Sequence, residues 1–341
     1  RDFTMNAIAY NDDGFIDPFN GMRDIKNKVI KCVGVAIDRF TEDPLRIMRA
    51  VRFAAQLGFH IENYTNIAMV QTNDGLSKIS AERIQSELCK ILISDHPEYV
   101  LDYYIDISPA IPELNKIMGC SQNNMYHIYD VWNHTRFALT ACRIHELETR
   151  LAILLHDIGK SESKVTENGI DHFYKHAVKS AEIADTMLRR LKFANYVREP
   201  VVELIANHDM IIVPKPNKIK KYLNKLGEAQ FRRLLDLRFC DIMAHNPYYA
   251  KERLWETFRA EEVLNEVLAE EKCFSIKDLA INGKDIMDLG IKEGPNVGKW
   301  LNYALDEVIN DRLENDKEDI LSDIDAKLYA EREENSDEKM P

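Results

Sequence analysis

The pattern of apolar and polar positions changes character near residue 40. Before that point, short apolar runs alternate with turn-forming residues at positions 11–14, 17–18 and 20–21, which predicts short strands and hairpins. Beyond it, apolar residues recur at helical spacing along most of the chain. The pattern therefore predicts a mainly α-helical protein with a small β-containing segment at its N-terminus.

Two amphipathic helices are expected after this segment. The first would take Thr41 as its N-cap, include Pro44 in its first turn and end at Gly58. One face of this helix is apolar and the opposite face carries arginines: Ile47, Val51, Ala54 and Ala55 against Arg46, Arg49 and Arg52. A second helix would follow Ser80, and breaks are expected at 95–97 and 109–112.

The remainder of the chain divides by composition. A helical, histidine-rich region comes first, and a charged amphipathic helix is expected over 251–271. A glycine-punctuated module at 279–310 and an acidic tail follow. We therefore expect four domains, at residues 1–40, 41–126, 127–250 and 251–341.

Composition excludes some classes of protein. The 341 residues carry a net charge of −12, which argues against indiscriminate nucleic-acid binding, and they contain no apolar run long enough to span a membrane. The six cysteines are scattered, which predicts thiols in a reducing compartment and hence a cytoplasmic protein: Cys32, Cys89, Cys120, Cys142, Cys240 and Cys273. A cluster of lysines at 215–225 leaves two interpretations open, a local RNA-binding face or a solvated helix face.

Four sequence blocks resemble one known family. The opening Arg-Asp-Phe-Thr-Met-Asn-Ala is similar to the R-R-D-F-T-x-N-A motif of the class II tRNA nucleotidyltransferase and poly(A) polymerase family, without its leading Arg. Residues 17–25 resemble that family's D-P-x-x-G-x-x-D segment, and residues 42–54 its E-D-P-x-R-x-x-R-A-x-R-F-A block. Residues 79–88 resemble its I-S-x-E-R-I-x-x-E-L helix. The resemblance implies a nucleotidyltransferase head, a helical neck and further helical domains.

The neck block would choose the nucleotide. Such an enzyme works without a template, so protein side chains must supply the hydrogen-bonding edge. The resemblance implies that Asp43 and Arg46 read the base, that Glu42 orients Arg46, and that Arg49 contacts the triphosphate. The alternative is an exposed basic face that is paired with Glu42 and Asp43.

The opening motif would complete the nucleotide site. The resemblance implies that Asp2 accepts from the ribose 2′-hydroxyl, that Asn6 contacts phosphate or ribose, and that Arg1 also binds nucleotide. In that family a D-x-D pair upstream of this motif binds Mg²⁺ for nucleotidyl transfer. We therefore expect these residues to form the C-terminal portion of such an enzyme, without its catalytic carboxylates. Asp12 and Asp13 follow the motif in an expected turn and do not take that place.

A second constellation lies in the histidine-rich region. Its members follow the H…HD…H…H…D order of the HD phosphohydrolase superfamily: His134, His156, Asp157, His176, His208 and Asp241. His156 and Asp157 follow an apolar helix, and coordination of a divalent metal such as Mn, Fe, Ni, Zn or Mg would offset the cost of burying them. The resemblance implies a metal site with a phosphate contact from Lys160. Four other histidines are expected to be structural or exposed: His127, His145, His172 and His245.

The glycine-punctuated module resembles the tail of HD-containing tRNA nucleotidyltransferases. Its glycines at 290, 294 and 298 would let helix N-termini approach a phosphate backbone, which implies a clamp on tRNA. Taken together, the blocks imply CCA addition to the tRNA 3′ end from CTP and ATP. The alternatives are a poly(A) polymerase, an HD phosphohydrolase as the main activity, and a non-catalytic RNA-binding fragment. The oligomeric state stays open.

Overall fold

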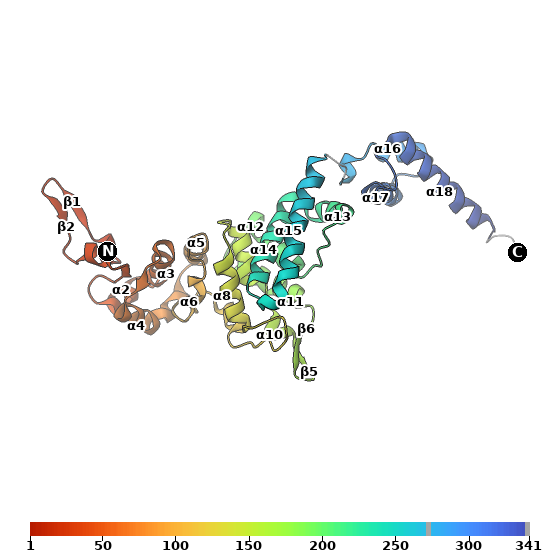
Figure 1. Ribbon diagram of the computed structural model, residues 1–341. Helices are drawn as coiled ribbons and strands as arrows, with labels where there is room; N and C mark the ends of the chain where they lie inside the picture. The colour runs from red at the N-terminus through yellow and green to blue at the C-terminus, as the bar shows by residue number, and fades with distance from the viewer. Residues whose placement is uncertain (271–273, 338–341) are drawn as a thin grey trace. The chain divides into compact units, whose positions relative to one another are not determined.

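The structure is a computed structural model that describes residues 1–270 and 274–337 (Figure 1). Helices dominate these residues, so the predicted mainly α fold is confirmed. The chain divides into two compact units. The first holds residues 1–210 and 233–254, and the second holds residues 211–232 and 255–341.

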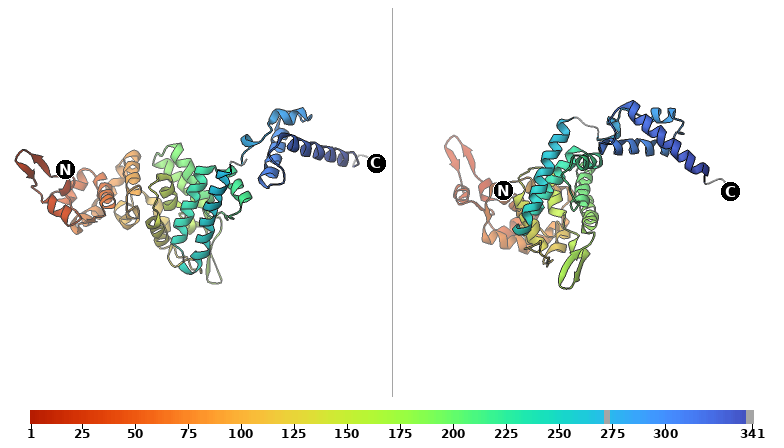
Figure 2. Two further views of the ribbon diagram at one scale, coloured as in Figure 1. Left: turned by 45° about the horizontal axis from the view of Figure 1, so that its top comes forward. Right: turned by 45° about the vertical axis from the view of Figure 1, so that its right-hand side comes forward.

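The strands of the first unit are short. β1 (Ala9–Asn11) and β2 (Gly14–Ile16) form an antiparallel hairpin at the predicted turn, and the hairpin projects away from the neighbouring helices (Figures 1 and 2). β3 (Val29–Ile30) pairs in parallel with β4 (His60–Ile61), and two helices lie between these strands in the chain. The predicted β content is therefore present, but it is smaller than the turn signals suggested.

The turn signals at 17–21 do not mark a hairpin. They lead instead into the helix α1 (Gly21–Lys26). The Asp17 carboxylate accepts hydrogen bonds from the N–H groups of Gly21 and Met22, at 2.7 and 2.9 Å. Because these N–H groups have no partner within the helix, an Asp at this place favours a helix start over a strand. A short 3-10 helix, η1 (Thr4–Asn6), precedes the hairpin.

The predicted helix start at Thr41 is wrong. Thr41 lies in the last turn of α2 (Ala36–Glu42), and a separate helix, α3 (Leu45–Leu57), follows. The reason is Pro44, because the residue before a proline is driven out of the helical region. Asp43 accordingly has φ −145° and ψ 97°, and its carboxylate accepts a hydrogen bond from the Leu45 N–H at 3.2 Å.

The end of α3, its apolar face and the helix after Ser80 are as predicted, but Arg52, expected on the opposite basic face, is buried against Glu87. α3 ends at Gly58, which adopts the left-handed conformation, and its predicted apolar face is buried. α5 (Ala81–Leu92) follows Ser80, and no helix crosses positions 95–97 or 109–112. Short helices complete this region: α4 (Asn63–Thr72), η2 (Asn73–Lys78), α6 (Tyr99–Asp102), α7 (Tyr104–Ile107) and η3 (Pro112–Ile117).

A helical bundle forms the rest of the first unit. Its helices are α8 (Val131–Ala141), α9 (Leu147–Leu155), α10 (Lys160–Ser163), α11 (His176–Arg190) and α12 (Asn195–Asn207). The hairpin of β5 (Lys164–Glu167) and β6 (Ile170–Phe173) extends from it (Figure 2). α14 (Glu228–Met243) and α15 (Pro247–Ala269) contribute residues to both units. Every side chain of α9 from Thr149 to Leu155 is buried, so this helix forms the centre of the bundle.

The second unit has its own core. Its remaining helices are α13 (Pro216–Leu226), η4 (Ile276–Asp278), α16 (Gly283–Asp288), α17 (Pro295–Ile309) and α18 (Lys317–Asp337). Ile286, Trp300, Leu305 and Ile320 are among the buried residues that pack together. The lysine cluster lies on α13, where Lys220 is 2% exposed and contacts Asp311 at 2.9 Å.

The cysteines and the apolarity of the helices were the basis of the predictions about cellular context. Five cysteines of the described residues are free thiols, and Cys273 lies outside those residues. In the part of the chain that the structure describes, no helix combines the length and apolarity that a membrane span requires.

Candidate functional sites

A polar pocket lies at the start of α3. Its volume is about 280 Å³, and four arginines and two aspartates dominate its wall: Arg1, Arg46, Arg49, Arg83, Asp2 and Asp43, with Leu45. The pocket joins the N-terminal motif to the neck helices, which are separated by about 40 residues in sequence. Such a concentration of guanidinium groups suits an anionic ligand that also offers hydrogen-bonding edges.

Asp2 holds Arg49 at the edge of this pocket. The Asp2 Oδ2 atom accepts from Arg49 Nε and Nη2, at 2.9 and 2.5 Å. Its Oδ1 atom accepts from the Phe3 N–H and from Asn6 Nδ2, at 2.9 and 3.0 Å. Burial raises the pKa of Asp2, but the hydrogen bonds from Asn6, Arg49 and Phe3 outweigh it and lower the pKa below its usual value. Both oxygens of Asp2 therefore have protein donors.

Each member of the expected base-reading pair has its own partner. Arg46 Nη1 lies 2.5 Å from Glu42 Oε2 and 3.0 Å from the backbone oxygen of Arg39. The hydrogen bond from Arg46 lowers the pKa of Glu42. Asp43 Oδ2 lies 3.2 Å from Nη2 of Arg83, a residue of α5 that the sequence reasoning did not assign to the site. Its position in the 79–88 block was the available signal.

Six expected metal ligands meet in the bundle, and we call them the histidine–aspartate cluster. They come from the starts or ends of different helices: His134 (α8), His156 and Asp157 (after α9), His176 (α11), His208 (after α12) and Asp241 (α14). His134, His156, Asp157 and His208 are buried, and the side chains of His176 and Asp241 are 12% and 14% exposed. The structure thus brings together residues that span more than 100 positions of sequence.

The backbone orients the four histidines of the cluster in the same way. Each Nδ1 atom lies within hydrogen-bond distance of a backbone oxygen, of Ala244 for His134, Ile153 for His156, Phe173 for His176 and Ile205 for His208. A carbonyl can only accept, so Nδ1 carries the proton and Nε2 is left to face the cluster. An imidazole held by one nitrogen with the other directed inward is the arrangement of a metal-binding histidine.

The donor set fits a divalent cation. Two groups have ligand atoms that lie within 4.8 Å of one another: His134, His156 and Asp241, and Asp157, His176 and His208. His156 Nε2 and Asp157 Oδ1 are buried without a hydrogen-bond partner, whereas Asp157 Oδ2 lies 2.7 Å from Lys160 Nζ. The Nε2 atoms of His176 and His208 face each other at 3.1 Å. Buried acceptors that face one another are costly unless a cation lies between them.

The electrostatics of the cluster also require a positive charge among its buried side chains. Burial lowers the pKa of His156, but the carboxylates of Asp157 and Asp241 raise it to about 10. Burial raises the pKa of Asp157, yet His156 and Lys160 bring it well below its usual value. Burial lowers the pKa of His208 to about 3, so this imidazole stays neutral. The buried carboxylates therefore demand positive charge, which a proton on His156 or a metal ion can provide.

A cavity of about 530 Å³ opens onto the cluster. Three histidines that were expected to be structural or exposed line it, namely His127, His172 and His245, so that expectation missed their place at the site. His145 is outside it, with a side chain that is 54% exposed. For His245 a signal existed, because it lies four residues after Asp241 on the helical period. His127 lies in a loop, so periodicity offered no signal for it.

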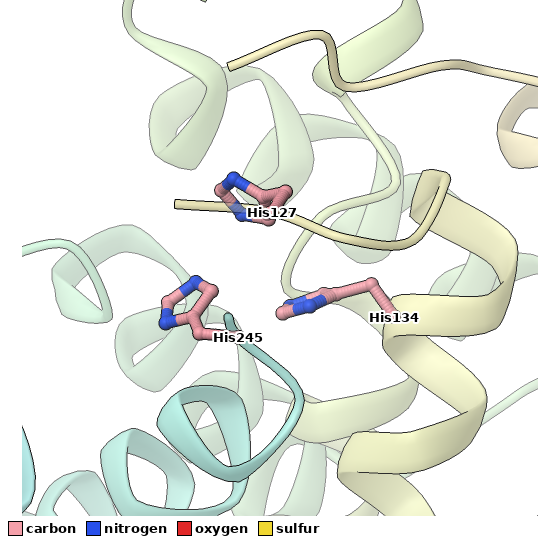
Figure 3. A group of neighbouring side chains, drawn as sticks. All are labelled: His127, His134 and His245. Carbon is pink, nitrogen blue, oxygen red and sulfur yellow. The ribbon is translucent and has the colours of Figure 1, made fainter. Parts of the chain in front are cut away.

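His127, His134 and His245 form a third compact histidine group, and their rings face one common space (Figure 3). In two of these three rings a nitrogen already faces a side-chain cation. His245 Nδ1 accepts a hydrogen bond from Arg253 Nη1 at 2.9 Å, and His127 Nε2 lies 3.5 Å from Lys160 Nζ. Burial, together with nearby positive charge, lowers the pKa of His127 to about 2, and burial lowers that of His245 to about 4. The first two groups therefore suit a metal ion better than this one.

Similar proteins place the whole chain in context. It is 32% identical to the multifunctional CCA protein of Aromatoleum aromaticum. The match extends over 279 residues, which are 75% of this chain and 67% of that protein. It is also 30% identical to the CCA-adding enzyme of Lactobacillus helveticus. That match extends over 334 residues, 95% of this chain and 71% of the enzyme. The chain belongs to the CCA-adding enzyme family.

Family matches and folds agree with this membership. Residues 1–31 match the Poly A polymerase head domain, residues 58–108 match the "Probable RNA and SrmB-binding site of polymerase A", and residues 172–324 match tRNA nucleotidyltransferase domain 2. The crystal structure of the Bacillus stearothermophilus CCA-adding enzyme in complex with CTP is 26% identical with a TM-score of 0.66, over 98% of this chain and 74% of that one. The Thermotoga maritima CCA-adding enzyme complexed with tRNA shares the fold, with a TM-score of 0.55.

Proposed function

We propose that this chain selects the nucleotide in CCA addition to the tRNA 3′ end, with CTP and ATP as the nucleotides. The observation that supports this most directly is the pocket in which Arg46, Arg49 and Asp43 meet the N-terminal motif. Asp43 and Arg46 would offer an acceptor and a donor to the edge of the base. Arg49, held by Asp2, would contact the triphosphate.

The 341 residues by themselves would bind nucleotide without adding it. Nucleotidyl transfer needs Mg²⁺ held by carboxylates, and in the family that the opening motif resembles these carboxylates come before it. Asp2 does not fit that role, because Arg49, Asn6 and Phe3 engage both of its oxygens. Incubation with CCA-less tRNA, CTP, ATP and Mg²⁺ should therefore yield no extended product. Robust incorporation of CMP would overturn this proposal.

Calorimetric titration tests the nucleotide pocket directly. CTP and UTP are titrated into the wild-type chain and into Asp43→Ala, Arg46→Gln and Arg23→Gln variants. Loss of one base-edge partner costs about 1–3 kcal/mol of discrimination. We expect the first two variants to lose the preference for CTP over UTP. Arg23, whose side chain is 65% exposed, lies outside the pocket and serves as the matched control. Unchanged preference in both pocket variants would refute the assignment.

A second candidate function is metal-dependent hydrolysis of a phosphoester at the histidine–aspartate cluster. The specific observation in its favour is the pair of unpartnered buried atoms, His156 Nε2 and Asp157 Oδ1, which a divalent cation would satisfy. The cluster opens onto a cavity large enough for a small ligand. In the reaction, water adds to phosphorus, a P–O bond breaks and the leaving oxygen takes a proton.

The chain's residues have distinct tasks in this proposal. His134, His156, Asp157 and Asp241 would hold one metal ion, with His176 and His208 completing a second site or contacting phosphate. A bound divalent metal ion acidifies water and so supplies a nucleophile near neutral pH. The backbone carbonyls fix the histidine rings, and the bundle around α9 buries Asp157 to 1% exposure.

Metal analysis together with an activity assay tests this second function. Wild type and a His156→Ala, Asp157→Ala double variant are assayed with a nucleoside 2′,3′-cyclic phosphate and a 2′-nucleotide, each with Mn, Ni, Mg and Zn. The wild type should retain metal and hydrolyse one of them, and the double variant should do neither. His145→Ala, at the exposed histidine outside the cavity, is the control and should match wild type. A metal-free, inert wild type would leave the cluster without this function.

We further propose that the second unit binds tRNA. Gly294, with φ 137°, precedes the 15-residue helix α17, whose N-terminal N–H groups can approach a phosphate. Gly298 lies inside α17, so it does not shape a turn. Lys220 and Lys221 of α13 contact Asp311 and Asp306, at 2.9 and 2.6 Å, which weakens the case for α13 as the RNA-binding face. The division into four domains and the cytoplasmic location remain proposals of the same kind.

A further inference from the structure

Lys160, the residue expected to contact phosphate, is fully engaged by the protein. Its Nζ atom lies 2.7 Å from Asp157 Oδ2, 2.6 Å from Gln122 Oε1 and 3.5 Å from His127 Nε2. An ammonium group has three N–H donors, so these three acceptors account for all of them. Its side chain is 6% exposed. Lys160 is therefore placed to neutralise Asp157 and to orient His127.

A second cation lines the same cavity. Arg253, on the first part of α15, has a side chain that is 33% exposed, against 6% for the side chain of Lys160. Its Nη1 atom lies 2.9 Å from His245 Nδ1, and its Nη2 atom lies 3.9 Å from Asp241 Oδ2. A guanidinium has five donors in a planar fork, so one arginine can contact an imidazole and a phosphate together.

His245 fixes the direction of this arginine. Arginine only donates, so His245 Nδ1 must accept and the ring proton resides on Nε2. That Nε2 atom lies 3.6 Å from Asp241 Oδ1. The ring is 5% exposed and packs at 4.6 Å from the His127 ring. His245 is thus a fixed spacer between Arg253 and the cluster, and it places a positive charge at the cavity wall beside the expected metal site.

We propose that Arg253, positioned by His245, is the phosphate-binding residue of this cavity, and that the ligand is a phosphoester of a single nucleoside. This inference rests on the hydrolytic function proposed above. The volume of about 530 Å³ suits one nucleotide. Tyr126, His172 and Phe173 line the wall and offer planar surfaces for a base. Lys160 acts on Asp157 and not on the ligand.

Binding of inorganic phosphate and of AMP to the full chain tests this assignment without any turnover. Arg253→Gln should weaken both by roughly ten- to hundredfold, since it removes a hydrogen bond from a charged donor. Arg253→Lys should recover only part of the loss, because an ammonium lacks the planar fork. Metal content should stay at the wild-type level in both. Arg259→Gln is the matched control, because Arg259 is on the same helix and pairs with Glu262 and Glu266.

A double-mutant cycle tests the positioning role of His245. His245→Asn should raise KM for the cyclic phosphate with little change in kcat, and it should add nothing further in the Arg253→Gln background. Additive effects in the two backgrounds would show that His245 acts independently of Arg253. Lys160→Gln should lower the metal content more than the phosphate affinity, because Lys160 contacts Asp157.

The outcomes separate this assignment from the hydrolytic function on which it rests. Hydrolysis with wild-type KM and phosphate affinity in Arg253→Gln would overturn the assignment and leave the hydrolytic function standing. A chain that binds AMP through Arg253 but hydrolyses nothing would keep the assignment and remove the hydrolytic function. Loss of AMP binding in Lys160→Gln at normal metal content would show that Lys160 binds the phosphate.

Discussion

Removal of Glu87 should loosen the neck helices more than any exposed substitution beside it. Glu87 of α5 pairs with Arg52 of α3, with Nε–Oε2 and Nη1–Oε1 distances of 3.2 and 3.4 Å. The Arg52 side chain is only 11% exposed and the Glu87 side chain only 5%. Burial lowers the pKa of Arg52 even though Glu87 raises it. A buried guanidinium without its carboxylate typically costs 3–5 kcal/mol, so we expect Glu87→Ala to destabilise this region by about 3 kcal/mol or more.

The chain folds as two units, so a local measurement is required. Hydrogen exchange of peptides from α3 and α5 gives the free energy of local opening. Glu82→Ala, at an exposed site on the same helix, should change it by no more than about 0.5 kcal/mol. Replacing both partners, Arg52→Met with Glu87→Leu, should restore it to within about 1 kcal/mol of wild type.

The single and double variants together show whether the unpaired buried charge causes the destabilisation. If Glu87→Ala costs less than about 1 kcal/mol, or if the double variant is as unstable as the single one, the desolvation argument is wrong. Nucleotide affinity should follow the same order, because α3 also carries Arg46 and Arg49.

Two further predictions concern local features of the first unit. The pKa of Asp2 is lowered in the folded state, so its contribution to stability is complete above the unfolded value of about 3.9 and is lost as the pH falls towards the lower folded value. Protection of the Phe3 amide, measured against its intrinsic exchange rate at each pH, should therefore decrease below about pH 4, and an Asp2→Asn variant should lack this decrease. A Cβ on Gly159 would lie 2.5 Å from the Ser180 backbone nitrogen, so Gly159→Ala should lower the thermal midpoint and the metal content of the cluster. Gly298→Ala meets no atom within 4 Å on α17 and should be neutral or stabilising by about 0.5–1 kcal/mol, and the opposite ranking would contradict the packing argument.

Local features of this protein were readable from its sequence. The apolar face of α3, its end at Gly58 and the start of α5 after Ser80 depend on periodicity and on backbone preferences of a few neighbouring residues. The residues of the histidine–aspartate cluster could be proposed because their order in the chain resembles that of a known superfamily. The Thr41 start failed for an equally local reason, because Pro44 excludes Asp43 from a helix and this rule outweighs the capping preference.

Only the tertiary structure decided which side chains share a site. Arg83 reaches Asp43 because α3 and α5 pack together, and Arg253 reaches His245 across the junction between α14 and α15. Lys160 is enclosed by acceptors from Gln122 and His127, more than 30 positions earlier in the chain. Hydrophobic periodicity reports which face of an element is buried, but it contains no information on which distant polar groups will meet there. That meeting is set by the packing of whole helices, and it determines whether a cation contacts a ligand or a neighbouring carboxylate.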